Sequence, residues 1–114
     1  MEHVHSIIII KKNNKYLNYY DDRWGIYLFP NIKGNDIEII KRKYNTDNVK
    51  LLFDIIHDKY SASHNEMRTY HHYFYEVDKD EIGDYFLLEE LLLKPKVKEY
   101  NEDIINFIKE YYGE

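Results

Sequence analysis

The chain has 114 residues, no cysteine and a formal net charge of −5. Its length allows one hydrophobic core, and the absence of cysteine excludes a fold built on disulfides. The longest aliphatic run, Ile7–Ile10, is far shorter than the ~20 residues of a transmembrane helix. We therefore expect a single soluble, cytoplasmic domain over residues 1–114 that makes no membrane contact by itself.

The charge is unevenly distributed along the chain. Residues 1–60 carry ten Lys/Arg against eight Asp/Glu, whereas residues 61–114 carry six against thirteen. Binding of bulk nucleic acid normally needs a clearly basic face, so the overall negative charge argues against it. An anionic ligand is expected to bind the N-terminal half.

Three strands are predicted in the N-terminal third. The β-branched stretch HVHSIIIIKK, residues 3–12, turns at Asn13-Asn14 and resumes as KYLNYY, residues 15–20, which predicts a hairpin. The third strand, WGIYLFP at residues 24–30, ends at a proline, which cannot continue a hydrogen-bonded ladder. Residues 33–43 predict a loop or a short helix.

The segment TDNVKLLFDIIHDKYS, residues 46–61, carries the clearest helical pattern. Its apolar residues recur three to four positions apart, as on one buried helical stripe. They are Val49, Leu52, Phe53, Ile56 and Tyr60. On the opposite face of this helix, Asp54, His57 and Asp58 would lie together at i, i+3 and i+4.

The remaining segments predict a strand followed by two helices. RTYHHYFYEV, residues 68–77, alternates in a way that suits a central strand with both faces occupied. FLLEELLL, residues 86–93, predicts a short helix ended by Pro95, and NEDIINFIKEYY, residues 101–112, predicts an amphipathic terminal helix. Together these elements indicate an α/β (α+β) fold with a mixed β-sheet flanked by helices.

This order of segments resembles the Nudix fold. WGIYLFPNIKG, residues 24–34, stands where Nudix proteins often carry Trp-x-Phe-Pro-Gly-Gly, and LLEELLLKP, residues 87–95, is similar to the leucine-rich turn before their terminal helix. The resemblance covers nearly the whole chain and implies a single Nudix-like domain.

The Nudix signature reads Gly-x5-Glu-x7-Arg-Glu-U-x-Glu-Glu-x-Gly-U, where U is aliphatic, and its glutamates hold divalent metal ions that assist attack on a diphosphate. On the helix predicted at residues 46–61, the signature places Phe53 at the arginine, Asp54 at the next glutamate, and His57 and Asp58 at the glutamate pair. The comparison implies a Nudix shape with a degenerate active segment.

One subset of this superfamily resembles the chain further. The phrase YSASHNEMRTYHHYFYEV, residues 60–77, is similar to the SMODS-associated Nudix domain. That family accompanies nucleotide-second-messenger synthetases in bacterial conflict systems, lacks the usual signature, and is often joined to membrane helices. The resemblance implies a catalytically inactive sensor of a nucleotide-derived second messenger in anti-phage defence of the CBASS type, here as the soluble part of a longer protein. If that protein is a membrane-anchored effector, the resemblance implies that the domain lies at the cytoplasmic side of the inner membrane.

Six residues are the candidates for binding such a nucleotide or cyclic oligonucleotide. An aromatic ring at residues 24–29 can stack on a base, and cations of the basic set Lys33, Lys41, Arg42, Lys43 and Arg68 can bind phosphate. The candidates are Trp24, Tyr27, Lys33, Arg68, Tyr70 and His72. The structural alternative is that the rings form the core and the basic run is a solvated loop.

No metal or other cofactor is expected for a sensor. Asp54, His57 and Asp58 are weak metal candidates, because two carboxylates and an imidazole suit a transition metal better than Mg²⁺. His71 and His72 cannot chelate one ion, since neighbours on a strand point to opposite faces. Two alternatives stay open: an active Nudix-type hydrolase using Asp54, Asp58 and Mg²⁺, and a protein-interaction module that forms a homo-oligomer.

Overall fold

The computed structural model describes residues 2–61 and 64–114, which form two compact units. Unit 1 consists of Met1–Ile10 and Pro30–Asp80, and unit 2 of Lys11–Phe29 and Glu81–Glu114. Met1, Ala62 and Ser63, the last two within the 60–77 phrase, lie outside the described residues.

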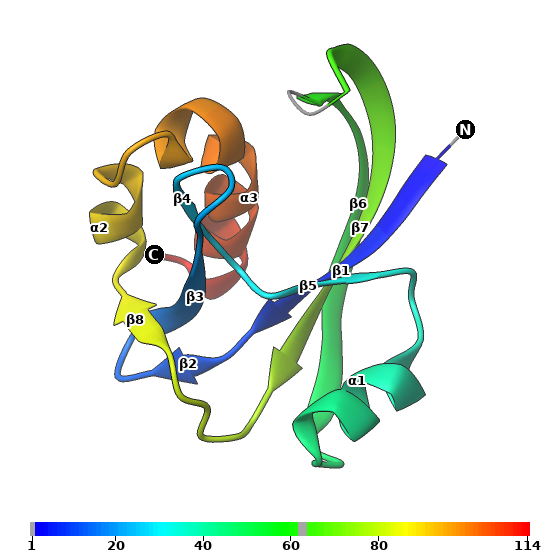
Figure 1. Cartoon of the computed structure of the whole chain (residues 1–114). Helices are drawn as coiled ribbons and strands as arrows, with labels where there is room; N and C mark the ends of the chain where they lie inside the picture. The colour runs from blue at the N-terminus through cyan, green and yellow to red at the C-terminus, as the bar shows by residue number, and fades with distance from the viewer. Residues whose placement is uncertain (1, 62–63) are drawn as a thin grey trace. The chain divides into compact units, whose positions relative to one another are not determined.

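Unit 1 is built on a four-stranded mixed sheet (Figure 1). Its strand order is β5 (Asn31–Lys33), β1 (Glu2–Ile9), β7 (Glu66–Val77) and β6 (Val49–Ser61). β1 and β7 run parallel, whereas β1–β5 and β6–β7 are antiparallel. β7 is therefore a central strand, as predicted, and the fold is of the α+β class with a mixed sheet.

The predicted helix at residues 46–61 is wrong, because this segment forms strand β6. A β-bulge between Leu51 and Phe53 inserts an extra residue and changes which face the following side chains occupy. The helix-like spacing arises because both faces of the strand carry apolar residues: Phe53 pairs with Phe74 on one face, and Ile56 pairs with His71 on the other. Phe53 is half-buried in the sheet and stacks on Phe74, with ring centroids 4.3 Å apart.

Helix α1 (Ile37–Tyr44) comes between β5 and β6 in the sequence and extends one residue beyond segment 33–43, which was predicted to be a loop or a short helix. The Asp36 side chain caps its start by accepting a hydrogen bond from the Glu38 N–H at 3.0 Å. Its buried residues, Ile40 and Tyr44, are one helical turn apart. Asn45 ends the helix in the left-handed conformation.

Unit 2 contains short strands: β2 (Lys11–Lys12), β3 (Lys15–Asp21), β4 (Ile26–Leu28) and β8 (Asp84–Phe86). β3 pairs with each of the other three. The turn at Asn13 and Asn14 is confirmed, because both have positive φ and join the paired residues Lys12 and Lys15. The predicted hairpin is confined to β2 and β3, since β1 pairs with β5 and β7 instead.

The two C-terminal helices of the prediction are confirmed in unit 2. α2 (Leu88–Leu92) ends before Pro95, and α3 (Val97–Tyr112) begins four residues earlier than the predicted segment 101–112. Asn101 is non-helical within α3, which places a kink where the predicted helix starts. The buried side chains of α3 include Ile104, Ile105 and Ile108 of the predicted apolar face.

Candidate functional site

Strand pairing in unit 1 gathers histidine and tyrosine side chains on one face of the sheet. Tyr70 and His72 alternate along β7, so they point to the same side. In the register, His3 pairs with Tyr70, His5 with His72, and His57 with Tyr70. Paired residues of neighbouring strands share a face. We call these five residues, His3, His5, His57, Tyr70 and His72, the histidine–tyrosine face.

Tyr70 lies at the centre of the histidine–tyrosine face. Its ring is stacked on that of His72, with centroids 5.2 Å apart and an interplanar angle of 5°. The rings of His3, His5 and His57 lie 5.7, 6.0 and 6.4 Å from it, all tilted. Tyr70 remains half-exposed. The face is therefore a cluster of aromatic and imidazole rings in which the Tyr70 ring is partly open to solvent.

Hydrogen bonds fix the imidazoles of this face. His57 Nε2 and His72 Nδ1 are 2.8 Å apart, so one nitrogen donates and the other accepts. His72 is only 5% exposed. His5 Nδ1 lies 3.0 Å from Asn31 Oδ1, which fixes the ring of His5 from the neighbouring strand β5.

Two predicted cations lie next to this face. Lys33 is exposed and pairs with His5 in the register. Arg68 donates a hydrogen bond to Glu66, with Nε and Oε1 2.7 Å apart. This bond holds the pKa of Glu66 below its usual value. Burial, and then the positive charge of Arg68, lower the pKa of His3.

The three weak metal candidates are separated by the sheet, because they lie on a strand instead of a helix. His57 belongs to the histidine–tyrosine face, whereas Asp54 and Asp58 pair with residues of the opposite face. There Asp54 Oδ2 lies 2.7 Å from His71 Nε2, and Asp58 accepts a hydrogen bond from Thr69. Within residues 2–61 and 64–114, no group of three or more metal-binding side chains is arranged to hold an ion.

The opposite placement of His71 and His72 was predicted from their adjacency and is confirmed. His71 contacts Asp54 on one face, and His72 contacts His57 on the other. His3 and His5 were missed as site residues. Their alternation in HVHS is the same period-two signal that marks Tyr70 and His72, but only the β1–β7 register places the two pairs together.

Trp24 and Tyr27 belong to unit 2 and are carried by the β3–β4 hairpin. Tyr27 is half-buried, with the rings of Tyr20 and Phe86 at 5.1 and 4.9 Å. Phe29 is buried. Trp24 is 48% exposed and lies in the turn rather than in the predicted strand. The rings of this stretch are therefore divided between buried and exposed positions, and the base-stacking role of Trp24 and Tyr27 stays a prediction.

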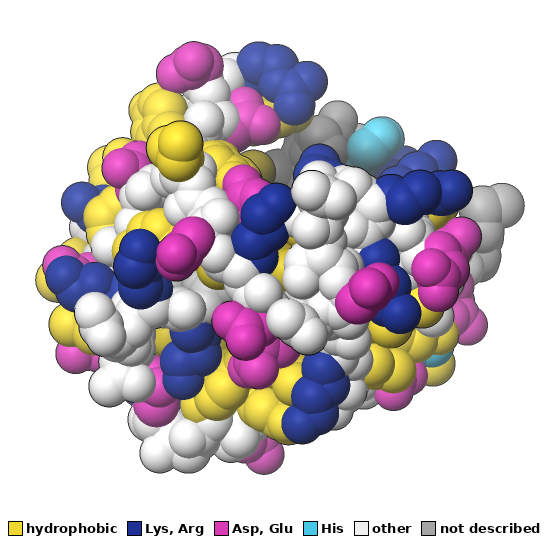
Figure 2. Space-filling view, turned by 90° about the horizontal axis from the view of Figure 1, so that it is seen from below, with side chains coloured by type: hydrophobic (Ala, Val, Ile, Leu, Met, Phe, Trp, Pro, Cys, Tyr) yellow, Lys and Arg dark blue, Asp and Glu magenta, His cyan; other side chains and the backbone are white. Residues whose placement is uncertain are grey.

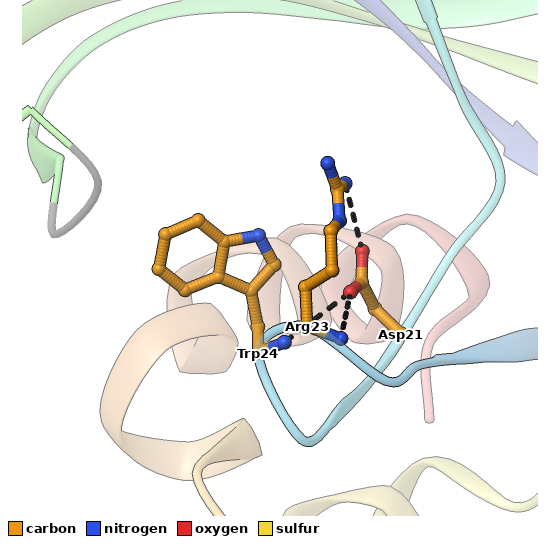
Figure 3. Close-up of polar contacts among 3 residues, drawn as sticks. All are labelled: Asp21, Arg23 and Trp24. Atoms are coloured by element: carbon orange, nitrogen blue, oxygen red, sulfur yellow. Dashed lines mark hydrogen bonds and ion pairs between the residues drawn. The ribbon is translucent and has the colours of Figure 1, made fainter.

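The turn that carries Trp24 is held by one carboxylate. Asp21 Oδ1 accepts hydrogen bonds from the backbone N–H groups of Arg23 and Trp24, at 2.9 and 3.3 Å. Its other oxygen, Oδ2, is 3.3 Å from the Arg23 guanidinium. The hydrogen bond from this guanidinium is the main cause of a lowered pKa of Asp21. Figure 3 shows the side chains of Arg23 and Trp24 extending side by side from the turn.

Solved structures of Nudix hydrolases share this fold. An Ap4A hydrolase from C. elegans matches with a TM-score of 0.60 at 10% identity, over 99% of this chain and 98% of that one. A Nudix hydrolase from Nitrosomonas europaea gives 0.57 at 16%, over 99% and 89%. A MutT protein from Bacillus halodurans gives 0.62 at 14%, over 91% and 80%. The chain therefore has a Nudix-like fold.

Comparisons of sequence add no further assignment. No protein-family profile matches the chain, and no curated protein matches it. None of the described helices is long and apolar enough to span a bilayer.

Proposed function

We propose that this chain is a catalytically inactive Nudix-like sensor domain that binds a nucleotide-derived second messenger in bacterial anti-phage defence. The fold is Nudix-like, and the resemblance of residues 60–77 to the SMODS-associated Nudix domain suggests the sensor role. The ligand site that we propose is the histidine–tyrosine face together with Lys33 and Arg68.

The proposal that the domain is catalytically inactive rests mainly on the charge of α1. This helix follows the Phe29-Pro30 corner, after which Nudix proteins carry their signature. The segment that joins this corner to β6, residues 31–48, is shorter than the Nudix signature. α1 has one carboxylate, Glu38, which pairs with Lys41 at 3.7 Å. Its last turn is basic, whereas metal-dependent hydrolysis needs carboxylates that hold divalent cations.

The chemistry of the histidine–tyrosine face supports a ligand with an aromatic base and phosphate groups. The half-exposed ring of Tyr70 offers a surface on which a base can stack. Lys33 supplies an exposed cation, and the fork-shaped guanidinium of Arg68 suits phosphate. Since Arg68 already binds Glu66, a phosphate at this position has to displace or share that guanidinium.

The surface charge favours a small anionic ligand over bulk nucleic acid. On the face of the molecule shown in Figure 2, Lys and Arg side chains are interspersed with Asp and Glu. Proteins that follow a nucleic-acid backbone instead present a basic stripe. We therefore expect recognition of one nucleotide-derived molecule through local contacts.

Thermal-shift screening against cyclic dinucleotides, cyclic oligonucleotides, ADP-ribose and NAD tests the sensor proposal. A ligand present at 100 times its Kd stabilises the native state by about 2.7 kcal/mol. We expect one class to stabilise the protein equally with Mg²⁺ and with a chelator, because the proposed site uses no metal. If none of these ligands stabilises the folded protein, the proposed ligand class is wrong.

The inactive assignment is tested separately by hydrolysis assays. We expect no metal-dependent cleavage of ADP-ribose or nucleoside triphosphates. Mg²⁺-dependent turnover that disappears in both Asp54→Ala and Asp58→Ala would instead support the hydrolase alternative, with these two carboxylates as the metal ligands. Leu51→Ala, which changes an exposed residue elsewhere on β6, is the matched control for folding.

A further inference from the structure

Two turns of unit 2 lie next to each other and expose large apolar side chains. One is the β3–β4 turn, residues 21–25, and the other joins α2 to the start of α3, residues 93–98. Lys96 Nζ donates a hydrogen bond to the Trp24 carbonyl oxygen at 2.8 Å, which connects them. We call residues 21–25 and 93–98 the double-turn tip; Figure 1 shows both segments within unit 2.

Trp24 and Leu93 are the apolar groups of the double-turn tip. Trp24 is 48% exposed and Leu93 is 86% exposed. The backbone of Trp24 is held on both sides, by Asp21 and by Lys96, yet its indole makes no hydrogen bond or ring contact within the described part of the chain. About half of Trp24 is therefore open to solvent although its backbone is held, and the Leu93 side chain, beyond the end of α2, is almost fully exposed.

The two turns carry more cations than carboxylates in a protein that is acidic overall. Residues 21–25 and 93–98 contain four cations, Arg23, Lys94, Lys96 and Lys98, and two carboxylates, Asp21 and Asp22. Lys94 Nζ lies 4.9 Å from the centroid of the Phe86 ring, which holds its charge above the aromatic row of Phe86, Tyr27 and Tyr20. The local charge is positive against a net −5 for the chain.

We propose that the double-turn tip docks on an anionic lipid surface. Trp24 and Leu93 enter the interfacial region of the bilayer, while Arg23, Lys94 and Lys98 bind the lipid headgroups. Tryptophan is favoured at membrane interfaces, and each Lys or Arg near an anionic leaflet adds attraction. The sequence alone predicts no membrane contact, because neither turn contains a continuous apolar run and the two meet only in the fold.

The chemistry of the tip favours lipid over the other anionic partners. Leu93 has no aromatic face on which a base can stack, so it adds nothing to nucleic-acid binding, whereas an aliphatic tip gains free energy in a bilayer. A stable protein interface buries about 800 Å² on each partner, which is far more surface than two apolar side chains provide. This proposal rests on unit 2 alone and does not depend on nucleotide binding.

Fluorescence provides a direct test, since Trp24 is the single tryptophan of the chain. Vesicles of phosphatidylcholine with phosphatidylserine are expected to shift its emission to shorter wavelengths and to protect it from iodide, because the indole leaves water. Vesicles of phosphatidylcholine alone are expected to have a much smaller effect, as are the same vesicles with serine lipids at high salt.

Variants separate the apolar and the charged contributions. Leu93→Ser should weaken vesicle binding about tenfold, and the double variant Lys94→Gln with Lys98→Gln about 20- to 30-fold. Both leave the contact between Lys96 and Trp24 in place. Met67→Ser and Lys50→Gln change an exposed apolar residue and an exposed cation of unit 1, and they should bind vesicles as the parent does.

The proposal is overturned if the folded protein shows no emission shift with anionic vesicles, or if Leu93→Ser binds them like the parent. A shift caused by single-stranded oligonucleotides but not by vesicles would assign the tip to nucleic acid. An emission shift caused only by the nucleotides of the thermal-shift screen would support the predicted base-stacking role of Trp24. Either result excludes lipid docking, whether or not the sensor proposal holds.

Discussion

The histidine–tyrosine face and the double-turn tip both display aromatic rings, but they hold them differently. On the face, rings come from three paired strands, contact one another and are partly buried, as with His72 at 5% exposure. On the tip, Trp24 comes from a turn, its hydrogen bonds to Asp21 and Lys96 involve its backbone, and its ring is 48% exposed. The fixed geometry of the face agrees with the proposed binding of one small molecule, whereas the exposed tip agrees with the proposed docking on a fluid, less specific surface.

The largest expected effect on stability comes from Phe74, which lies buried beside the histidine–tyrosine face. Phe74 is fully buried on β7, on the same side of the sheet as Tyr70 and His72. Phe74→Ala should cost about 3–5 kcal/mol in the free energy of unfolding, because it leaves a cavity in a central strand. Denaturant titration measures this cost.

Phe53→Ala is the matched control for this prediction. Its ring stacks on Phe74 but is half-exposed on the edge strand β6, so its removal should cost clearly less than removal of Phe74. Equal losses for both variants would mean that the face has no rigid base, and the contrast with the double-turn tip would disappear.

The β6 segment shows what sequence patterns can and cannot predict in this chain. β7 and the helices α2 and α3 were predicted because their alternation or apolar stripe is uninterrupted. β6 was predicted as a helix because its apolar residues lie on both faces of the strand, as Phe53 and Ile56 do, and so recur at a spacing that resembles a helical stripe. α1 was left undecided, since a short helix with one buried turn has a weak pattern.

The candidate site was predictable in part for the same reason. Tyr70 and His72 were identified because they alternate along one strand. Their joining with His3 and His5 depends on the parallel pairing of β1 with β7, which connects segments far apart in the sequence and has no local signal. Trp24 was placed in a strand, whereas Asp21 and Gly25, at φ 64°, make its position a turn.

A smaller effect is expected on nucleotide affinity when one aromatic residue of each region is replaced by alanine. Tyr70→Ala should weaken binding of the nucleotide found in the thermal-shift screen about tenfold or more, because stacking on a base is worth roughly 1–3 kcal/mol. Trp24→Ala should leave that affinity unchanged. Isothermal titration calorimetry measures both values.

Tyr100→Ala controls for loss of a tyrosine, since Tyr100 is exposed on α3 in unit 2. Lys33→Ala should also weaken binding, with an effect that shrinks as salt rises. If Trp24→Ala reduces nucleotide affinity as strongly as Tyr70→Ala, the two regions act as one site and the comparison fails.

The smallest effect concerns pH and the double-turn tip. The hydrogen bond from Arg23, with those from the Arg23 and Trp24 backbone, holds the pKa of Asp21 below its ordinary 3.8. Because the folded-state pKa is the lower one, the stabilisation of the turn is present above pH 3.8 and is lost as the pH falls through the folded pKa. Trp24 emission should therefore change with a midpoint below pH 3.8, while circular dichroism follows global unfolding.

Asp21→Asn should remove this transition, whereas Asp22→Asn, which changes the neighbouring carboxylate, should keep it. A midpoint at or above 3.8, or a transition that persists in Asp21→Asn, would show that this carboxylate does not hold the turn in place, and the indole would then lack the fixed backbone that the comparison assigns to it.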